Sequence, residues 1–190
     1  MSVWNPKVRG TFQYSSVSIS VEAMFGTDFE QIQLGWIVNP NMYGDTRTHL
    51  FFQMTDGADS PRTGKWWVYF NTEPHPVGYF PNKLFFELNS GANTLKWGGY
   101  VFTGPNDNAS PQMGSGKFDN GEYQRTAYMT NVQNVGANNQ LVRLPNDIQT
   151  AESCCYLEGD ESYKDETIGY TFCFGGKGGI LDYCYNGTSK

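Results

Sequence analysis

The sequence predicts an all-β protein, an antiparallel β-sandwich with at most one short helix. Three observations predict this class: apolar and polar residues alternate with a period of two, turn motifs follow one another at short intervals, and the composition is unusual. Of 190 residues, 22 are glycine, 9 are proline, 16% are aromatic and only 17% are charged. This composition is typical of a turn-rich domain packed around aromatic rings. We expect one domain, covering residues 1–190.

The expected strands are identified from this alternation. In residues 16–22, valine and isoleucine alternate with serine and Glu22, which predicts a half-buried strand. In residues 31–38, the even positions are apolar and are expected on the core face, which leaves Gln31 and Gln33 on the other face. Further strands are expected at 50–54, 65–71, 95–102, 126–133 and 167–174, separated by Gly-, Asn-, Asp- and Pro-rich turns.

One short helix is expected at 81–88. Pro81 suits a first helical turn, and Leu84, Phe85 and Leu88 recur at helical spacing.

The charge pattern excludes two classes of partner. The formal charge is −6 and no Lys/Arg cluster is present, which argues against nucleic acid and against an anionic membrane surface. No apolar run approaches the roughly 18 residues of a spanning helix. The first residues of this chain show no signal-peptide pattern, whereas two sequons, at Asn108 and Asn186, favour the secretory route.

The four cysteines lie close together near the C-terminal end: Cys154, Cys155, Cys173 and Cys184. An even, clustered set is typical of disulfides, and four cysteines allow three pairings. A zinc site is less favoured because the spacing contains no C-x-x-C and both histidines lie far upstream. We therefore expect disulfides and no metal, with free thiols as the remaining alternative.

No familiar catalytic motif is evident. The only histidines are His49, at the edge of an expected strand, and His75, between two prolines. There is no G-x-S-x-G motif for a serine hydrolase. The glycine-rich run at 175–179 lacks the spacing of a phosphate-binding loop and predicts a turn, so no cofactor is expected.

Carboxylates are the remaining candidates, since two facing acids can activate water and protonate a leaving group. Glu22, Glu30 and Glu87 are the candidates on or near strands, and further acids crowd residues 152–166. For each of them, the simplest interpretation is a solvated surface position.

Several segments in one order carry a family resemblance. They are VWNPKV (3–8), QIQLGWIVNP (31–40), YGD (43–45), THLF (48–51), TGKWWVYF (63–70), VGYFP (77–81), KWGG (96–99) and QMGSGKF (112–118), with a Cys-Tyr pair further on. Together they resemble the neprosin family, plant prolyl endopeptidases of the glutamic-peptidase type.

The resemblance implies a secreted, acid-active, monomeric β-sandwich that cleaves after proline in a peptide or protein substrate, without a cofactor. In the family, one glutamate acts as general base on water and a second assists as acid or stabilises the oxyanion. The matching positions here carry Gln33 and Tyr100. The candidates for substrate binding are the neighbouring residues Trp36, Trp97, Gly98 and Gly99.

These two substitutions predict a weak or inactive copy. A glutamine can still polarise a carbonyl, and the related eqolisins use a Gln–Glu pair, so Gln33 is tolerable. A phenol, as at Tyr100, is neutral in acid and cannot take a proton from water. Glu30 cannot replace either residue, because it lies an odd number of positions from Gln33 and faces the other side of the strand.

Two further inferences come from the resemblance. An internal, cysteine-bearing segment is missing near residues 56–62, which predicts a shortened copy. The family disulfide corresponds to Cys155 and Cys184, which leaves Cys154 and Cys173 as a possible second pair.

Two alternatives stay open. A non-catalytic secreted β-sandwich could bind proline-rich peptide or glycan by stacking on the rings of Trp36, Trp66, Trp67, Trp97 and Tyr100. The simpler interpretation of each tryptophan is a position in the core of the sandwich. The chain could also be a gene remnant without a stable product.

Overall fold

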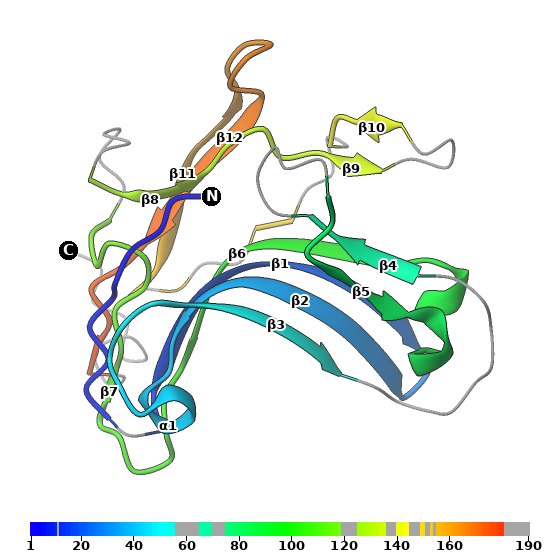
Figure 1. The fold of residues 1–190 in the computed structure, drawn as a ribbon. Helices are drawn as coiled ribbons and strands as arrows, with labels where there is room; N and C mark the ends of the chain where they lie inside the picture. The colour runs from blue at the N-terminus through cyan, green and yellow to red at the C-terminus, as the bar shows by residue number, and fades with distance from the viewer. Residues whose placement is uncertain are drawn as a thin grey trace. The chain divides into compact units, whose positions relative to one another are not determined.

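The computed structural model describes residues 1–10, 12–55, 65–69, 75–118, 125–135, 140–144, 149–150, 153 and 155–180 (Figure 1). It consists mainly of antiparallel strands with one short α-helix and two 3-10 turns, so the predicted all-β class is confirmed. The predicted missing segment at 56–62 lies outside the described residues. Within the described part of the chain, no helix has the length and hydropathy needed to cross a membrane.

The longest strands form a four-stranded sheet in the order β3-β2-β1-β6. Its members are β1 (Tyr14–Phe25), β2 (Asp28–Val38), β3 (His49–Thr55) and β6 (Thr94–Phe102). The chain divides into two compact units, and each of these strands contributes residues to both. The first unit comprises Met1–Val17, Trp36–Leu50 and Gly98–Lys190, and the second comprises Ser18–Gly35 and Phe51–Trp97.

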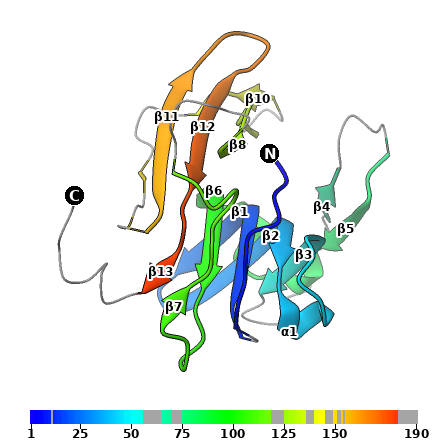
Figure 2. The same ribbon diagram turned by 90° about the vertical axis from the view of Figure 1, so that its left-hand side faces the viewer.

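The first unit also contains a three-stranded antiparallel sheet, β11-β12-β8, and two short ribbons. These strands are β7 (Ala109–Ser110), β8 (Ala127–Met129), β9 (Asn134–Val135), β10 (Leu141–Val142), β11 (Leu157–Tyr163), β12 (Tyr170–Gly175) and β13 (Gly179–Ile180). Figure 2 shows β7 beside β13, and β11 and β12 as a long hairpin. Phe172 and Phe174 on β12 face Met129 and Ala127 on β8, and all four are buried.

Helix α1 (Pro40–Tyr43) is a single turn where the sequence predicts a turn. Asn39 caps it by accepting a hydrogen bond from the Met42 amide, Pro40 starts it, and Gly44 ends it at φ 73°.

The second unit has its own apolar core under the ribbon β4 (Lys65–Val68)–β5 (Gly78–Pro81). Ala23, Ile32, Phe85 and Leu88 form a buried cluster, against which Val21, Met54, Trp66, Phe80, Leu84 and Ala92 pack.

The predicted helix at 81–88 is wrong. The segment forms two 3-10 turns, η1 (Asn82–Leu84) and η2 (Leu88–Ser90). The amides of Phe86, Glu87 and Leu88 donate to the carboxylate of Glu30 instead of to helix carbonyls. An acceptor from outside the segment therefore interrupts the helix.

Three predicted strands are shorter than expected. The expected strand 65–71 ends with β4 at Val68, since Tyr69 is no longer in a strand. The expected strand 126–133 is limited to β8, and β12 begins at Tyr170 rather than at residue 167. The carboxylate of Asp165 accepts hydrogen bonds from the amides of Thr167 and Ile168 and holds them in a turn.

Candidate functional site

Gln33 lies on β2, within the second unit, on the polar face that the sequence predicts for it. Its side chain is half-buried, and its Nε2 donates a hydrogen bond to the Ser18 hydroxyl at 2.7 Å. The amide is thereby held in place by β1. An amide nitrogen committed in this way leaves the Gln33 carbonyl oxygen as the group that can accept a hydrogen bond.

Glu22 is a buried carboxylate on the polar face of β1, where the sequence predicts a solvated position. It is 3% exposed, and Ser16, Ser18 and Ser20 are also buried. The prediction of a half-buried strand with a solvated polar face is therefore wrong.

Three side chains satisfy the Glu22 carboxylate. Oε1 accepts hydrogen bonds from Ser20 Oγ at 3.1 Å and from Gln31 Nε2 at 2.8 Å, and Oε2 lies 2.6 Å from Lys96 Nζ. A buried carboxylate needs such partners because an unpaired one is strongly disfavoured. The sequence signal for this network was the polar residues Gln31 and Lys96 on neighbouring strands.

Glu30 is also buried, at 1% exposure, and its predicted surface position is wrong as well. Its carboxylate accepts hydrogen bonds from the three consecutive amides of residues 86–88, at 2.6, 2.8 and 2.8 Å. Because Glu30 and Gln33 are an odd number of residues apart, they lie on opposite faces of β2. Glu30 anchors a loop and does not belong to the polar face of Gln33.

Tyr100 lies in the first unit, in a row of three stacked rings that we call the aromatic row: Tyr14, Tyr100 and Phe102. The ring centroids of Tyr14 and Tyr100 are 5.9 Å apart, and those of Tyr14 and Phe102 are 5.2 Å apart. Tyr100 is 51% exposed. Burial, and secondarily the neighbouring Tyr100 phenol, raises the pKa of Tyr14. The aromatic row presents ring surface and phenol groups but no carboxylate.

The residues predicted to bind substrate are divided between the two units, with Trp97 in the second and Trp36, Gly98 and Gly99 in the first. Trp36 and Trp97 are half-buried. A Cβ at Gly99 would lie close to the Met113 side chain and 3.1 Å from the Phe174 ring, so a larger residue there would require the Met113 side chain to move.

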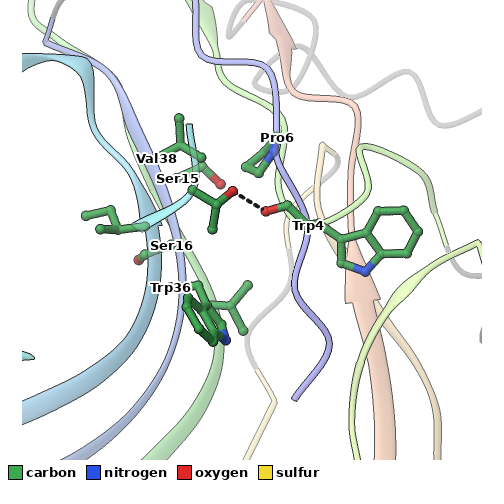
Figure 3. A pocket seen from close by; sticks show the side chains of 10 residues that line it. Trp4, Pro6, Ser15, Ser16, Trp36 and Val38 are labelled. Carbon is green, nitrogen blue, oxygen red and sulfur yellow. Dashed lines mark hydrogen bonds between the residues drawn. The ribbon is translucent and has the colours of Figure 1, made fainter. Parts of the chain in front are cut away.

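Trp36 lines a small, open pocket in the first unit (Figure 3). The lining consists of Trp4, Pro6, Ser15, Ser16, Val17, Trp36, Ile37, Val38, Thr48 and Gly114, none of them charged. One wall is held in place by a 2.7 Å hydrogen bond from the Thr48 hydroxyl to the Trp4 carbonyl. The buried Ser15 hydroxyl has no hydrogen-bond partner among the described residues.

The cysteines only partly follow the prediction. Cys173 is completely buried and carries a thiol, so the possible second pair, Cys154–Cys173, is wrong. Its place in the central strand β12, opposite Gly159 on β11 and Tyr128 on β8, explains this. Cys155 is disulfide-bonded. Cys154 and Cys184 lie outside the described residues, and the pairing Cys155–Cys184 stays a prediction.

Of the two sequons, Asn108 is exposed in the turn before β7, and Asn186 lies outside the described residues. Their glycosylation stays a prediction. Among the described residues, no three His, Cys, Asp or Glu side chains gather in a way that could hold a metal ion.

Asp45 and His49, from the YGD and THLF segments, form an ion pair. His49 Nε2 lies 2.8 Å from Asp45 Oδ1, and Arg47 Nη2 lies 2.8 Å from Asp45 Oδ2. The His49 ring stacks on Tyr43 with centroids 4.0 Å apart. The hydrogen bond from His49, followed by those from Arg47, holds the pKa of Asp45 well below its usual range.

This ion pair predicts a dependence of stability on pH. Because the pKa of Asp45 is lower in the folded chain than in the unfolded chain, its contribution is complete above the unfolded value of about 3.9 and is lost as the pH falls below it. Between pH 5 and pH 2, the free energy of unfolding should therefore fall more steeply for the parent than for Asp45→Asn. Urea denaturation at several pH values measures both slopes, and equal slopes would contradict the prediction.

The geometry defines an all-β protein with antiparallel sheets, with a polar hydrogen-bonded strand face around Gln33 in the second unit and an aromatic row around Tyr100 in the first. A family model described as Neprosin matches residues 11–62 and 57–177. The chain therefore belongs to the neprosin family, whose members are generally extracellular.

Proposed function

We propose that this chain is a secreted neprosin-type, proline-directed peptidase whose catalysis is weak or lost. The observation that carries the proposal is the pair of residues at the positions matched to the family glutamates. Gln33 binds the Ser18 hydroxyl through its amide, and Tyr100 stacks on Tyr14. Neither side chain is a carboxylate. The exposed sequon at Asn108 and the extracellular family support secretion.

The chemistry of peptide hydrolysis explains the expected loss. A general base must take a proton from water as it attacks the carbonyl, and removing such a base typically costs about two to four orders of magnitude in rate. A glutamine carbonyl and a neutral phenol are both too weakly basic for this step. Gln33 could still position or polarise a scissile carbonyl.

The buried carboxylates on β1 and β2 do not offer a replacement base. Glu22 is paired with Lys96 and accepts two further hydrogen bonds, while Glu30 is bonded to three amides. The carboxylate oxygens that would take a proton from water are therefore already engaged by donors of the chain itself. Both groups support the strands rather than activate water.

The test is digestion of a proline-containing peptide at acidic pH by the purified chain, with products identified by mass spectrometry. We expect no cleavage by the parent, and cleavage after proline by Tyr100→Glu or by the double variant Tyr100→Glu/Gln33→Glu, at least about 100-fold above the parent.

Tyr100→Gln is the matched control for Tyr100→Glu. It also removes the ring, and glutamine has the same shape as glutamate but cannot act as a base. Cleavage by the parent would show that another group acts as base and would overturn the proposal. Equal activity of Tyr100→Gln and Tyr100→Glu would mean that the ring, and not the missing carboxylate, blocks the site.

The aromatic row supports a second candidate function, a non-catalytic module that binds proline-rich peptide or glycan. Tyr14, Tyr100 and Phe102 present stacked ring surface of the kind on which pyrrolidine or sugar rings pack. For this function, Tyr100→Ala should weaken peptide or glycan binding about tenfold, as measured by calorimetry. Unchanged binding would exclude the aromatic row as the site.

A further inference from the structure

The ribbon β4–β5 in the second unit has two faces of different chemistry. Residues pair across it as Lys65 with Pro81, Trp66 with Phe80 and Trp67 with Tyr79. Trp66 and Phe80 pack against the buried cluster of this unit. Since side chains alternate along a strand, Lys65, Trp67 and Tyr79 lie on the opposite, outer face.

The outer face exposes aromatic and apolar side chains. Trp67 is 50% exposed and Tyr79 is 46% exposed, with ring centroids 5.0 Å apart and ring planes inclined at 53°. Tyr69 and Val77, at the next outward positions, are also exposed. We call Trp67, Tyr69, Val77 and Tyr79 the ribbon stripe. Contiguous exposed apolar surface of this kind marks binding sites, whereas single exposed rings do not.

A cation lies on this stripe. Lys65 Nζ lies 4.3 Å from the centroid of the Tyr79 ring and 5.2 Å from that of the Trp67 ring. The attraction of the ring faces for the ammonium group holds it there. Lys65 forms no ion pair with any other residue that the structure describes, so its charge is available to an external anion.

We propose that the ribbon stripe binds an acidic polysaccharide built of uronic acid units. The C–H face of a pyranose ring packs on an exposed Trp or Tyr ring, and the carboxylate of a uronic acid complements the Lys65 ammonium. The two ring planes are inclined at 53°, so each ring offers its own face to a sugar ring. Because the chain carries a net charge of −6, long-range attraction does not bring a polyanion to it. Recognition therefore needs the rings and the cation together.

This inference does not depend on the proposal that the chain is a peptidase with weak or lost catalysis. Its test is titration of the folded protein with an oligogalacturonate, followed by tryptophan fluorescence and calorimetry at low salt. Two control ligands separate charge from sugar. The fully methyl-esterified oligomer of the same length has the same sugar rings without the negative charge, and polyglutamate has the negative charge without sugar rings. We expect binding of the oligogalacturonate, about threefold to fivefold weaker binding of the ester, and no binding of polyglutamate.

Two variants with matched controls locate the site. Trp67→Ala should weaken oligogalacturonate binding about tenfold, whereas Phe25→Ala, which removes an exposed ring elsewhere in the same unit, should leave it unchanged. Lys65→Gln should reduce the affinity for the acid to that for the ester, whereas Lys83→Gln should not. Circular dichroism checks that each variant is folded.

Four results would overturn the proposal: no binding of the oligogalacturonate, equal binding of acid and ester by the parent, binding of polyglutamate, or unchanged affinity in Trp67→Ala. Displacement of the sugar by a neutral glycan or a proline-rich peptide at equal concentration would assign the stripe to that ligand instead.

Discussion

Replacing Glu30 by alanine is expected to lower the free energy of unfolding by about 3–4 kcal/mol. The variant removes the carboxylate that accepts hydrogen bonds from the backbone amides of Phe86, Glu87 and Leu88. Leu88 is one of the four residues of the buried cluster, so the loss extends to the apolar core of the second unit. Urea denaturation followed by fluorescence measures the change.

Two controls separate the anchoring role of Glu30 from a general effect of charge. Glu30→Gln keeps the shape and one oxygen acceptor and should cost less than Glu30→Ala. Asp28→Ala removes an exposed acid from the same strand and should change stability by no more than about 0.5 kcal/mol. If Glu30→Ala costs no more than Asp28→Ala, the carboxylate does not hold the loop.

Replacing Gly178 by alanine is expected to destabilise the chain by about 3 kcal/mol or more. Its φ is +64°, and a Cβ there would lie 2.3 Å from the Pro111 carbonyl oxygen and 2.4 Å from that of Ser110. Both contacts are with backbone, so relief requires movement of β7 and of the segment after it. Thermal and urea denaturation measure the loss.

Gly44→Ala is the matched control for backbone strain alone. Gly44 has a similar φ of +73°, but no atom lies within 4 Å of its hypothetical Cβ. Its replacement should cost only the left-handed conformation, about 1–2 kcal/mol. Equal losses in the two variants would mean that the close approach at Gly178 contributes nothing.

The strands were predictable from the sequence where one face is apolar throughout. Residues 31–38 form the predicted strand, and Ile32 and Val38 are buried on the predicted core face. The division of faces is less sharp than predicted, because Trp36 is only half-buried and Ile37, on the other face, is buried. The segment 81–88 was not predictable, since its helical spacing is real but an acceptor from β2, distant in sequence, captures its amides. The helix propensity of a segment carries no information about a hydrogen-bond acceptor, such as Glu30, that lies elsewhere in the sequence.

The candidate site was predictable only in part. The matched positions Gln33 and Tyr100 came from the family resemblance, whereas the stacking of Tyr100 on Tyr14 requires the pairing of β1 with β6, which no local pattern specifies. The burial of Glu22 was missed because serine and glutamate alternating with valine usually indicate solvent on one side. Here Gln31 and Lys96 satisfy that carboxylate.

The reactivity of the buried Cys173 thiol can be used to measure local opening of the β11-β12-β8 sheet. With both neighbouring strands in place, an alkylating reagent in solution has no route to a completely buried sulfur. The rate at which Cys173 is labelled, read by peptide mapping, therefore follows how often this sheet opens under native conditions. A substitution elsewhere that loosens the sheet without unfolding the chain would show itself first as faster labelling.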